Sequence, residues 1–219
     1  MGTKIPKSMA GYVLTVNGLV IPEDVGVTIM HEHILVDISV DKAPGHNAPV
    51  TELDLWQQEL NLENLHYVHE GRHIKDNYML TDESLAAKEL QHFKNGGGKT
   101  VVEVTSIGLA RDPLGLRRVA NAVGINIVMG SGWYQTAYHP PNMDQRTVED
   151  LTEEIVRDIM VGVENTGIRS GIIGEVGING NQLKPNEIKS IKASARASRA
   201  TGAAISFHKG GTGREKLEV

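Results

Sequence analysis

Two histidines, His31 and His33, stand one residue apart in an apolar run that starts at Gly26. The run is short and rich in β-branched residues, which predicts a buried β-strand. Because side chains alternate faces along a strand, both imidazoles point the same way and Glu32 points the other way. Two imidazoles on one face can share a metal ion. They can equally be hydrogen-bonded structural histidines, and the spacing alone does not decide between these two alternatives.

Two further ligand candidates lie at the ends of later apolar segments. Glu175 lies inside segment 171–177, where burying a carboxylate is unfavourable unless it is paired or binds a cation. Its alternative is an outward-facing or ion-paired carboxylate. His208 ends segment 203–208, where a lone histidine is more often a hydrogen-bonded core residue. The chain has no cysteine, so a metal site here has only nitrogen and oxygen ligands, which suit Zn²⁺, Mn²⁺ or a similar divalent ion.

Aromatic and basic side chains follow two other predicted strands. Trp133, Tyr134 and His139 come after strand 125–130 and predict one wall of a substrate pocket, with a packed loop as the equal alternative. Arg111 follows strand 100–105 and is either half of an ion pair or a contact for substrate.

Two segments match known motifs without fitting their structural context. Segment 69–73 reads His-Glu-Gly-Arg-His, the pattern of zinc proteases in which two histidines share a helix face. Gly71 within it weakens a helix, and we interpret the segment as a solvated helical face. Segment 96–100 reads Gly-Gly-Gly-Lys-Thr but joins a helix to a strand, the reverse of a phosphate-binding loop. We interpret it as a helix end.

Alternating strands and helices position these candidates. A hairpin is predicted over 11–22, a helix near 53–72 and a second helix over 82–94 with Thr81 as its cap. The strands that follow are 100–105, 125–130, 171–176 and 203–208, and the helices between them are 113–123, 147–165 and 185–200. This alternation predicts βα units and a parallel sheet.

Reactive groups at the carboxyl ends of successive parallel strands are typical of an α/β fold, the (β/α)₈ TIM barrel. A doubly wound sheet is the structural alternative, but the glycine-rich phosphate turn after its first strand is absent. A (β/α)₈ barrel needs about 250 residues. The five βα units of this 219-residue chain therefore predict a single domain over 1–219 that is incomplete at its C-terminus. An unclosed barrel would have low stability, weak metal binding and little turnover.

The amino-acid composition argues against some classes of binding partner. The net charge is −5 and no basic stripe is present, which argues against nucleic acid as a ligand. No apolar run approaches membrane-spanning length, and the first residues have no apolar signal core. We therefore expect a cytoplasmic protein that acts on a small molecule.

Taken in order, these segments resemble the phosphotriesterase-related family of the amidohydrolase superfamily. The segments that carry the resemblance are 26–33, 97–105, 108–112, 124–134, 171–177 and the strand ending at His208. The resemblance implies a TIM barrel with a two-metal centre, usually zinc. His31 and His33 would hold the first ion, Glu175 would bridge both, and His208 would hold the second. A bridging glutamate in place of a carbamylated lysine implies the glutamate-bridged branch of the family. The family pattern adds a histidine from the sixth strand and an aspartate from the eighth, both beyond the end of this chain.

The resemblance also implies an activity. Two metal ions would share a hydroxide that attacks a carboxylic ester, lactone or amide, or less favourably a phosphoester. Family relatives include monomers and dimers, so a homodimer is one assembly to consider. The alternatives are a TatD-type metal-dependent deoxyribonuclease, which the absence of a basic surface opposes, a zinc protease centred on segment 69–73, and a metal-binding remnant without catalysis.

Overall fold

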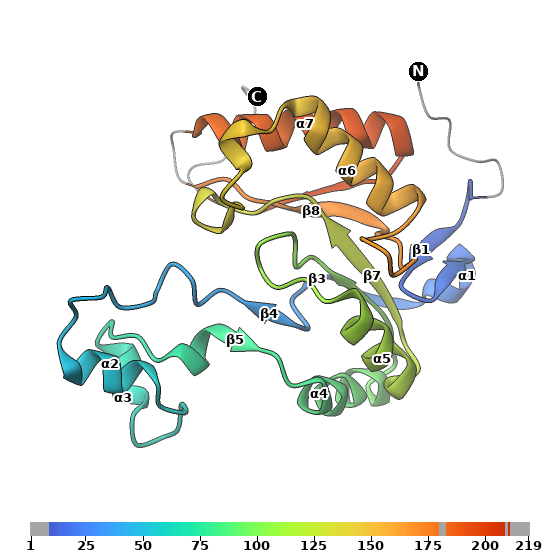
Figure 1. Ribbon diagram of the computed structural model, residues 1–219. Coiled ribbons are helices and arrows are strands. Elements are labelled where there is room, and N and C mark those ends of the chain that lie inside the picture. Colours follow the sequence, from blue (N-terminus) through green and yellow to red (C-terminus); the bar gives the residue numbers. More distant parts are fainter. Residues whose placement is uncertain (1–8, 180–182, 209, 211–219) are drawn as a thin grey trace.

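A five-stranded parallel sheet forms the centre of the computed structural model, which describes residues 9–179, 183–208 and 210. Its strands, in spatial order, are β3 (Val27–Glu32), β6 (Gly98–Glu103), β7 (Asn126–Ser131), β8 (Ile172–Val176) and β9 (Ile205–Phe207). All four pairings are parallel, so the carboxyl ends of the strands meet at one edge. The curled sheet confirms the predicted TIM-barrel type (Figure 1), with five strands of which the first four are each followed by a described helix.

Four helices pack on this sheet and bury its apolar residues. They are α4 (Glu83–Asn95), α5 (Pro113–Val123), α6 (Val148–Met160) and α7 (Pro185–Thr201). α4 packs against α5, and α6 packs against α7 (Figure 1). Leu116 and Ile127 belong to a core cluster between α5 and the sheet, and Ile155 and Ile173 belong to a second cluster beneath α6 and α7. The predicted alternation of strands and helices is thus confirmed.

Capping residues explain where these helices begin and end. α5 has the predicted bounds because Asp112 accepts a hydrogen bond from the Gly115 N–H at its start and Gly124 adopts a left-handed φ of 72° at its end. A capping box formed by Thr147 and Asp150 begins α6. α6 stops at Met160 rather than 165, and Gly162 beyond it has a φ of 136°.

The segment between β3 and α4 departs most from the prediction. It pairs β4 (Val36–Asp37) with β5 (Met79–Leu80) and carries α2 (Val50–Trp56), α3 (Leu65–His69) and a 3₁₀ turn, η1 (Lys75–Tyr78), away from the sheet (Figure 1). A continuous helix near 53–72 is wrong. The Asn61 side chain accepts hydrogen bonds from the N–H groups of Glu63 and Asn64, and such local bonds compete with a helix. Asp82 rather than Thr81 caps α4, because its side chain accepts from the Ser84 N–H.

The remaining short elements lie before β3 and after β7. The predicted hairpin is confirmed as β1 (Val13–Thr15) and β2 (Gly18–Val20), and it is followed by α1 (Pro22–Val25). Two 3₁₀ turns, η2 (Thr136–Tyr138) and η3 (Met143–Gln145), lie between β7 and α6. Within the described ranges no helix is long and apolar enough to cross a membrane.

The strand that carries the histidine pair is exposed rather than buried. Val27 and Met30 each keep 65% of their surface exposed. The prediction of a buried strand is wrong for a topological reason, since among the described residues β3 pairs only with β6 and lies at the sheet edge. Its apolar composition is typical of a strand whose two faces are both covered.

Candidate metal centre

Three of the four predicted metal ligands converge at the carboxyl edge of the sheet. His31, His33 and Glu175 each place a ligand atom within 4.8 Å of the other two. Nε2 of His31 lies 3.1 Å from Oε2 of Glu175, and Nε2 of His33 lies 3.4 Å from Oε1. Both imidazoles therefore face the same carboxylate, as the strand alternation predicted. Glu32 instead accepts a hydrogen bond from the His33 backbone N–H.

The curvature of the sheet brings Glu175 to β3, from which two strands separate it. The Glu175 backbone N–H donates to the carbonyl of Val104, just after β6, at 2.7 Å, so β8 passes the end of β7. Gly130 on β7 makes this approach possible. A Cβ at Gly130 would lie 2.0 Å from the carbonyl oxygen of Gly174. A side chain there would push β8 away from the histidines.

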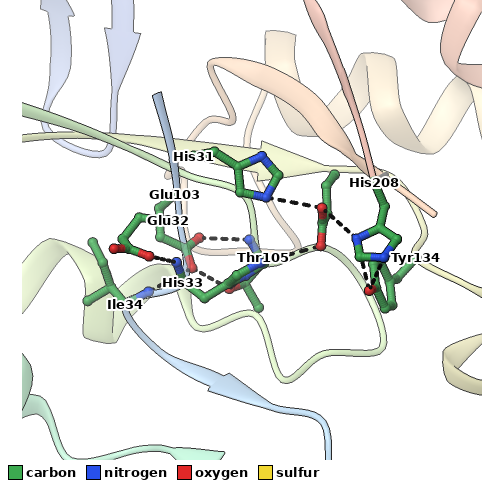
Figure 2. Close-up of polar contacts among 9 residues, drawn as sticks. His31, Glu32, His33, Ile34, Glu103, Thr105, Tyr134 and His208 are labelled. Atoms are coloured by element: carbon green, nitrogen blue, oxygen red, sulfur yellow. Dashed lines mark hydrogen bonds and ion pairs between the residues drawn. The ribbon is translucent and has the colours of Figure 1, made fainter. Parts of the chain in front are cut away.

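His208 approaches the same carboxylate with its own aromatic neighbour. Its Nδ1 lies 3.1 Å from Oε2 of Glu175, and the Tyr134 hydroxyl lies 3.0 Å from its ring nitrogens. Figure 2 shows His31 and His33 at one end of this group and His208 with Tyr134 at the other. Histidines from the ends of β3 and β9 thus face one carboxylate from two sides.

Electrostatics keep this carboxylate ionised. Burial alone would raise the pKa of Glu175, but hydrogen bonds and positive charge from His208 and His33 outweigh it and lower the pKa to about 2. Burial likewise opposes protonation of His33, yet the hydrogen bond and charge of Glu175, with the charges of Glu103 and Glu32, raise the pKa of His33. Glu175 and His33 thus stabilise each other's charged forms in the metal-free chain.

The donor set fits a divalent metal ion. Imidazole nitrogens and a carboxylate oxygen are common ligands of Zn²⁺ and suit Mn²⁺ as well. Metal-binding histidines usually hydrogen-bond through their second ring nitrogen, and His33 Nδ1 lies 3.0 Å from the Thr105 hydroxyl. The ligand types, their convergence and the contact between His33 and Thr105 are therefore all consistent with a divalent metal site.

The sequence interpretation missed Glu103, a fully buried carboxylate behind His33. Thr105 donates a short hydrogen bond from its hydroxyl to Oε1 of Glu103 (Figure 2). The backbone N–H groups of Ile34 and Thr105 also donate to Glu103, each at 3.3 Å. The signal that identified Glu175, a carboxylate inside an apolar strand, is present at Glu103 too.

The predicted pocket residues separate into different environments. Of these residues, only Tyr134 contacts the predicted metal ligands, through His208. Trp133 is fully buried in the core beneath α6, with the Arg146 guanidinium 5.1 Å from its ring centroid, so the packed-loop alternative describes it. His139 donates from Nε2 to the Tyr134 carbonyl at 2.8 Å and holds that loop, and burial lowers the pKa of His139.

Of the two interpretations of Arg111, an ion pair or a substrate contact, the structure shows the ion pair. Nη1 of Arg111 lies 2.9 Å from Oδ2 of Asp158 on α6 and donates to the carbonyl of Gly130 at 3.1 Å. Both side chains of the pair are buried, so the guanidinium stabilises the sheet–helix junction and the structure does not bring it to the metal group.

The protease-like segment does not form the helical site its pattern requires. α3 ends at His69, and Gly71 adopts a φ of 81°. His69 and His73 therefore do not share a helix face, and His73 Nδ1 instead lies 2.6 Å from the Tyr78 hydroxyl. Both the zinc-protease alternative and the prediction of a helical face over 69–73 are wrong.

Comparison with known proteins identifies the family. The model of the phosphotriesterase family matches residues 11–219. The chain belongs to the phosphotriesterase family. The N-acetyltaurine hydrolase of Dictyostelium discoideum is 35% identical over 228 residues, which cover 95% of this chain and 61% of that protein. The phosphotriesterase-related protein of Nematostella vectensis is also 35% identical, with 92% of this chain and 58% of that protein covered.

A solved structure agrees with the fold. The resiniferatoxin-binding protein from Rhodobacter sphaeroides superposes with a TM-score of 0.85 at 30% identity, covering 95% of this chain and 58% of that one. The resemblance inferred from the sequence is therefore confirmed at the level of family and fold. This phosphotriesterase-family chain spans about three-fifths of the length of the relatives it matches.

Proposed function

We propose that this chain carries the metal centre of a divalent-metal-dependent hydrolase, with Zn²⁺ as the first candidate ion and Mn²⁺ as the second. His31, His33 and Glu175 would hold one ion. Glu175 and His208 would hold another, with Glu175 as the bridging group of the glutamate-bridged branch. The observation that carries this proposal is the approach of all three imidazoles to the two oxygens of one buried carboxylate.

Divalent ions in such a site polarise a scissile carbonyl or phosphoryl group and make a water molecule more acidic. The chain's own residues supply the surroundings for that chemistry. Glu175 stays ionised at neutral pH because its pKa is about 2, so it contributes a permanent negative charge. Burial and the nearby charge of Glu175 raise the pKa of Tyr134, which keeps its phenol protonated. Tyr134 can therefore donate a hydrogen bond to a substrate oxygen beside His208.

The substrate class we propose is a small molecule with a carboxylic amide, ester or lactone bond. Membership of the phosphotriesterase family supports hydrolysis, and two relatives at 33–35% identity are named N-acetyltaurine hydrolase. An N-acyl amide is accordingly the first substrate to test, ahead of a phosphoester. The same membership favours this function over a TatD-type deoxyribonuclease.

Metal content is the first test of the centre. The full chain is purified without chelator, next to His31→Ala and the matched control His69→Ala, and its zinc and manganese are measured by mass spectrometry. His69 is an exposed imidazole at the end of α3, so its removal changes the histidine count but not the centre. We expect metal in the parent and the control and loss of metal in His31→Ala. Metal retained in His31→Ala, or absent from all three, would overturn the proposed centre.

Hydrolysis is tested separately. The metal-loaded chain is assayed for acid released from N-acetyltaurine, a lactone and a carboxylic ester, and for cleavage of single-stranded DNA. We expect slow, chelator-sensitive cleavage of an acyl substrate, in line with the little turnover expected of an unclosed barrel, and no cleavage of DNA. Metal binding without hydrolysis of any acyl substrate would instead support a non-catalytic metal-binding protein, and DNA cleavage would support the deoxyribonuclease.

A further inference from the structure

Glu103 is a charged group buried where the proposed hydrolytic mechanism gives it no task. It lies at the end of β6 with none of its surface exposed, and burial raises its pKa to about 7 against the hydrogen bonds that favour the ionised form. Burying a carboxylate is unfavourable unless its oxygens are fully hydrogen-bonded. The structural alternative is that Glu103 only fastens β3 to β6. Its hydrogen-bond partners show that it does more.

Glu103 is the acceptor in each of the hydrogen bonds that its side chain makes. The backbone N–H groups of Ile34 and Thr105 bond to its two oxygens and can only donate. The Thr105 hydroxyl completes the set at Oε1. The ionised carboxylate can only accept, so the single hydroxyl proton of Thr105 points to it.

This arrangement leaves Thr105 only lone pairs for its other neighbour. That neighbour is His33 Nδ1 at 3.0 Å, which must therefore carry the proton and donate to Thr105. Nε2 is the atom that faces Glu175, and the charged ring holds a proton there as well as on Nδ1. A neutral imidazole that keeps its proton on Nδ1 has its lone pair at Nε2.

We propose that Glu103 is a positioning residue that acts through the Thr105 hydroxyl to fix His33 in the tautomer whose unprotonated Nε2 can bind a metal ion. The inference rests on the proposed metal centre and adds the group that sets its ligand chemistry. Within the described part of the chain, the hydrogen bonds of Glu103 go to Ile34 and Thr105 and not to a proposed metal ligand. Glu103 determines the direction of the hydrogen bonds that reach His33.

Glu103→Gln is the substitution that reverses this direction with almost no change in shape. With its amide nitrogen at the Oε1 position, the new side chain gives up the bond from the Ile34 N–H and donates to the Thr105 oxygen. The Thr105 hydroxyl then donates to His33 Nδ1, and His33 carries its proton on Nε2. Thr105→Val removes the hydroxyl at similar volume, whereas Thr105→Ser keeps it. Glu187→Gln is the matched control. Glu187 is equally buried and accepts from the Thr136 hydroxyl and the N–H groups of residues 179 and 184, but its hydrogen bonds reach no histidine.

The direct readout is the His33 tautomer in the metal-free chain, measured from imidazole ¹⁵N chemical shifts at alkaline pH, where the ring is neutral. We expect an Nδ1–H signature in the parent, Thr105→Ser and Glu187→Gln, and a shift toward Nε2–H in Glu103→Gln. The second readout is zinc affinity from chelator competition. We expect a 10–100-fold loss in Glu103→Gln and Thr105→Val, the range typical of outer hydrogen-bond partners, and less than a threefold change in the other two variants.

The outcomes separate this inference from the proposed function. An unchanged tautomer and zinc affinity in folded Glu103→Gln would overturn it. If that variant does not fold, equal zinc affinity and tautomer in Thr105→Val and Thr105→Ser would overturn it instead. A parent chain that binds no zinc but shows the Nδ1–H form, lost in Glu103→Gln, would contradict the metal centre while supporting the hydrogen-bond chain.

Discussion

Asp158→Ala tests whether Arg111 is structural or contacts substrate. In the native chain the Arg111 guanidinium pairs with Asp158 at 2.9 Å, with 8% and 1% of the two side chains exposed. The substitution leaves a buried cation with one remaining contact, the carbonyl of Gly130. It also removes the acceptor of the Ser131 hydroxyl, which donates to Asp158 at 2.8 Å.

The expected cost follows from this burial. Breaking a buried ion pair by removing one partner costs about 3–5 kcal/mol, because the remaining charge stays desolvated. The hydrogen bond lost by Ser131 contributes about 1 kcal/mol, which places the total near the upper end of that range. For a chain of this size we therefore expect the midpoint of thermal unfolding to fall by roughly 10–15 °C.

The assay is urea unfolding followed by circular dichroism on the parent, Asp158→Ala, Arg111→Met and the double variant Arg111→Met/Asp158→Leu. The double variant removes both charges and should recover most of the stability lost in Asp158→Ala. Zinc content should not change in any of the four. A loss below 1 kcal/mol in Asp158→Ala would refute the reasoning. Unchanged stability with lost turnover in Arg111→Met would restore Arg111 as a substrate contact.

Three further perturbations test the site and the helices that support it. The folded-state pKa of Glu175 is about 2 against an ordinary 4.5, so its ionised form stabilises the metal-free chain by about 3 kcal/mol just above pH 4.5, where the imidazoles that lower this pKa are charged. This stability is lost as the pH falls toward 2. The difference in unfolding free energy between the parent and Glu175→Gln should shrink across that window, and a pH-independent difference would contradict the assignment. His208→Ala should lower the zinc content from two ions per chain to one, measured by mass spectrometry, and two ions retained would exclude His208 as a ligand. Thr147→Ala removes half of the α6 capping box and should cost about 1 kcal/mol in urea unfolding with zinc content unchanged, whereas no loss of stability would argue that the cap contributes little.

Local signals in the sequence were sufficient where a helix end is determined by its own residues. The Asp112 cap, Pro113 and Gly124 fix α5 at its predicted bounds without help from the rest of the fold. The helix predicted near 53–72 failed because hydropathy does not reveal that the Asn61 side chain binds the backbone ahead of it. The exposure of β3 also lay beyond sequence reasoning, because burial depends on which strand lies alongside.

The candidate site was predictable to the extent that strand periodicity determines it. Alternation placed His31 and His33 on one face correctly, and the sheet placed Glu175 and His208 beside them. Alternation could not say which of two adjacent aromatic residues faces the centre. Trp133 packs into the core, while Tyr134 reaches His208. Only the tertiary structure distinguishes these two side chains.

The proposed metal ligands come together only because the sheet is curved. β3 and β8 are three strand spacings apart, which in a flat sheet is about 14 Å between backbones. A histidine and a glutamate reaching toward each other across that gap would not come within 3.1 Å, the distance between His31 and Glu175. The Glu175 N–H closes the gap by bonding to Val104, which requires a residue without a side chain at position 130. Gly130 therefore belongs to the site as much as the ligands do, although it contacts none of the imidazoles and carries no reactive group.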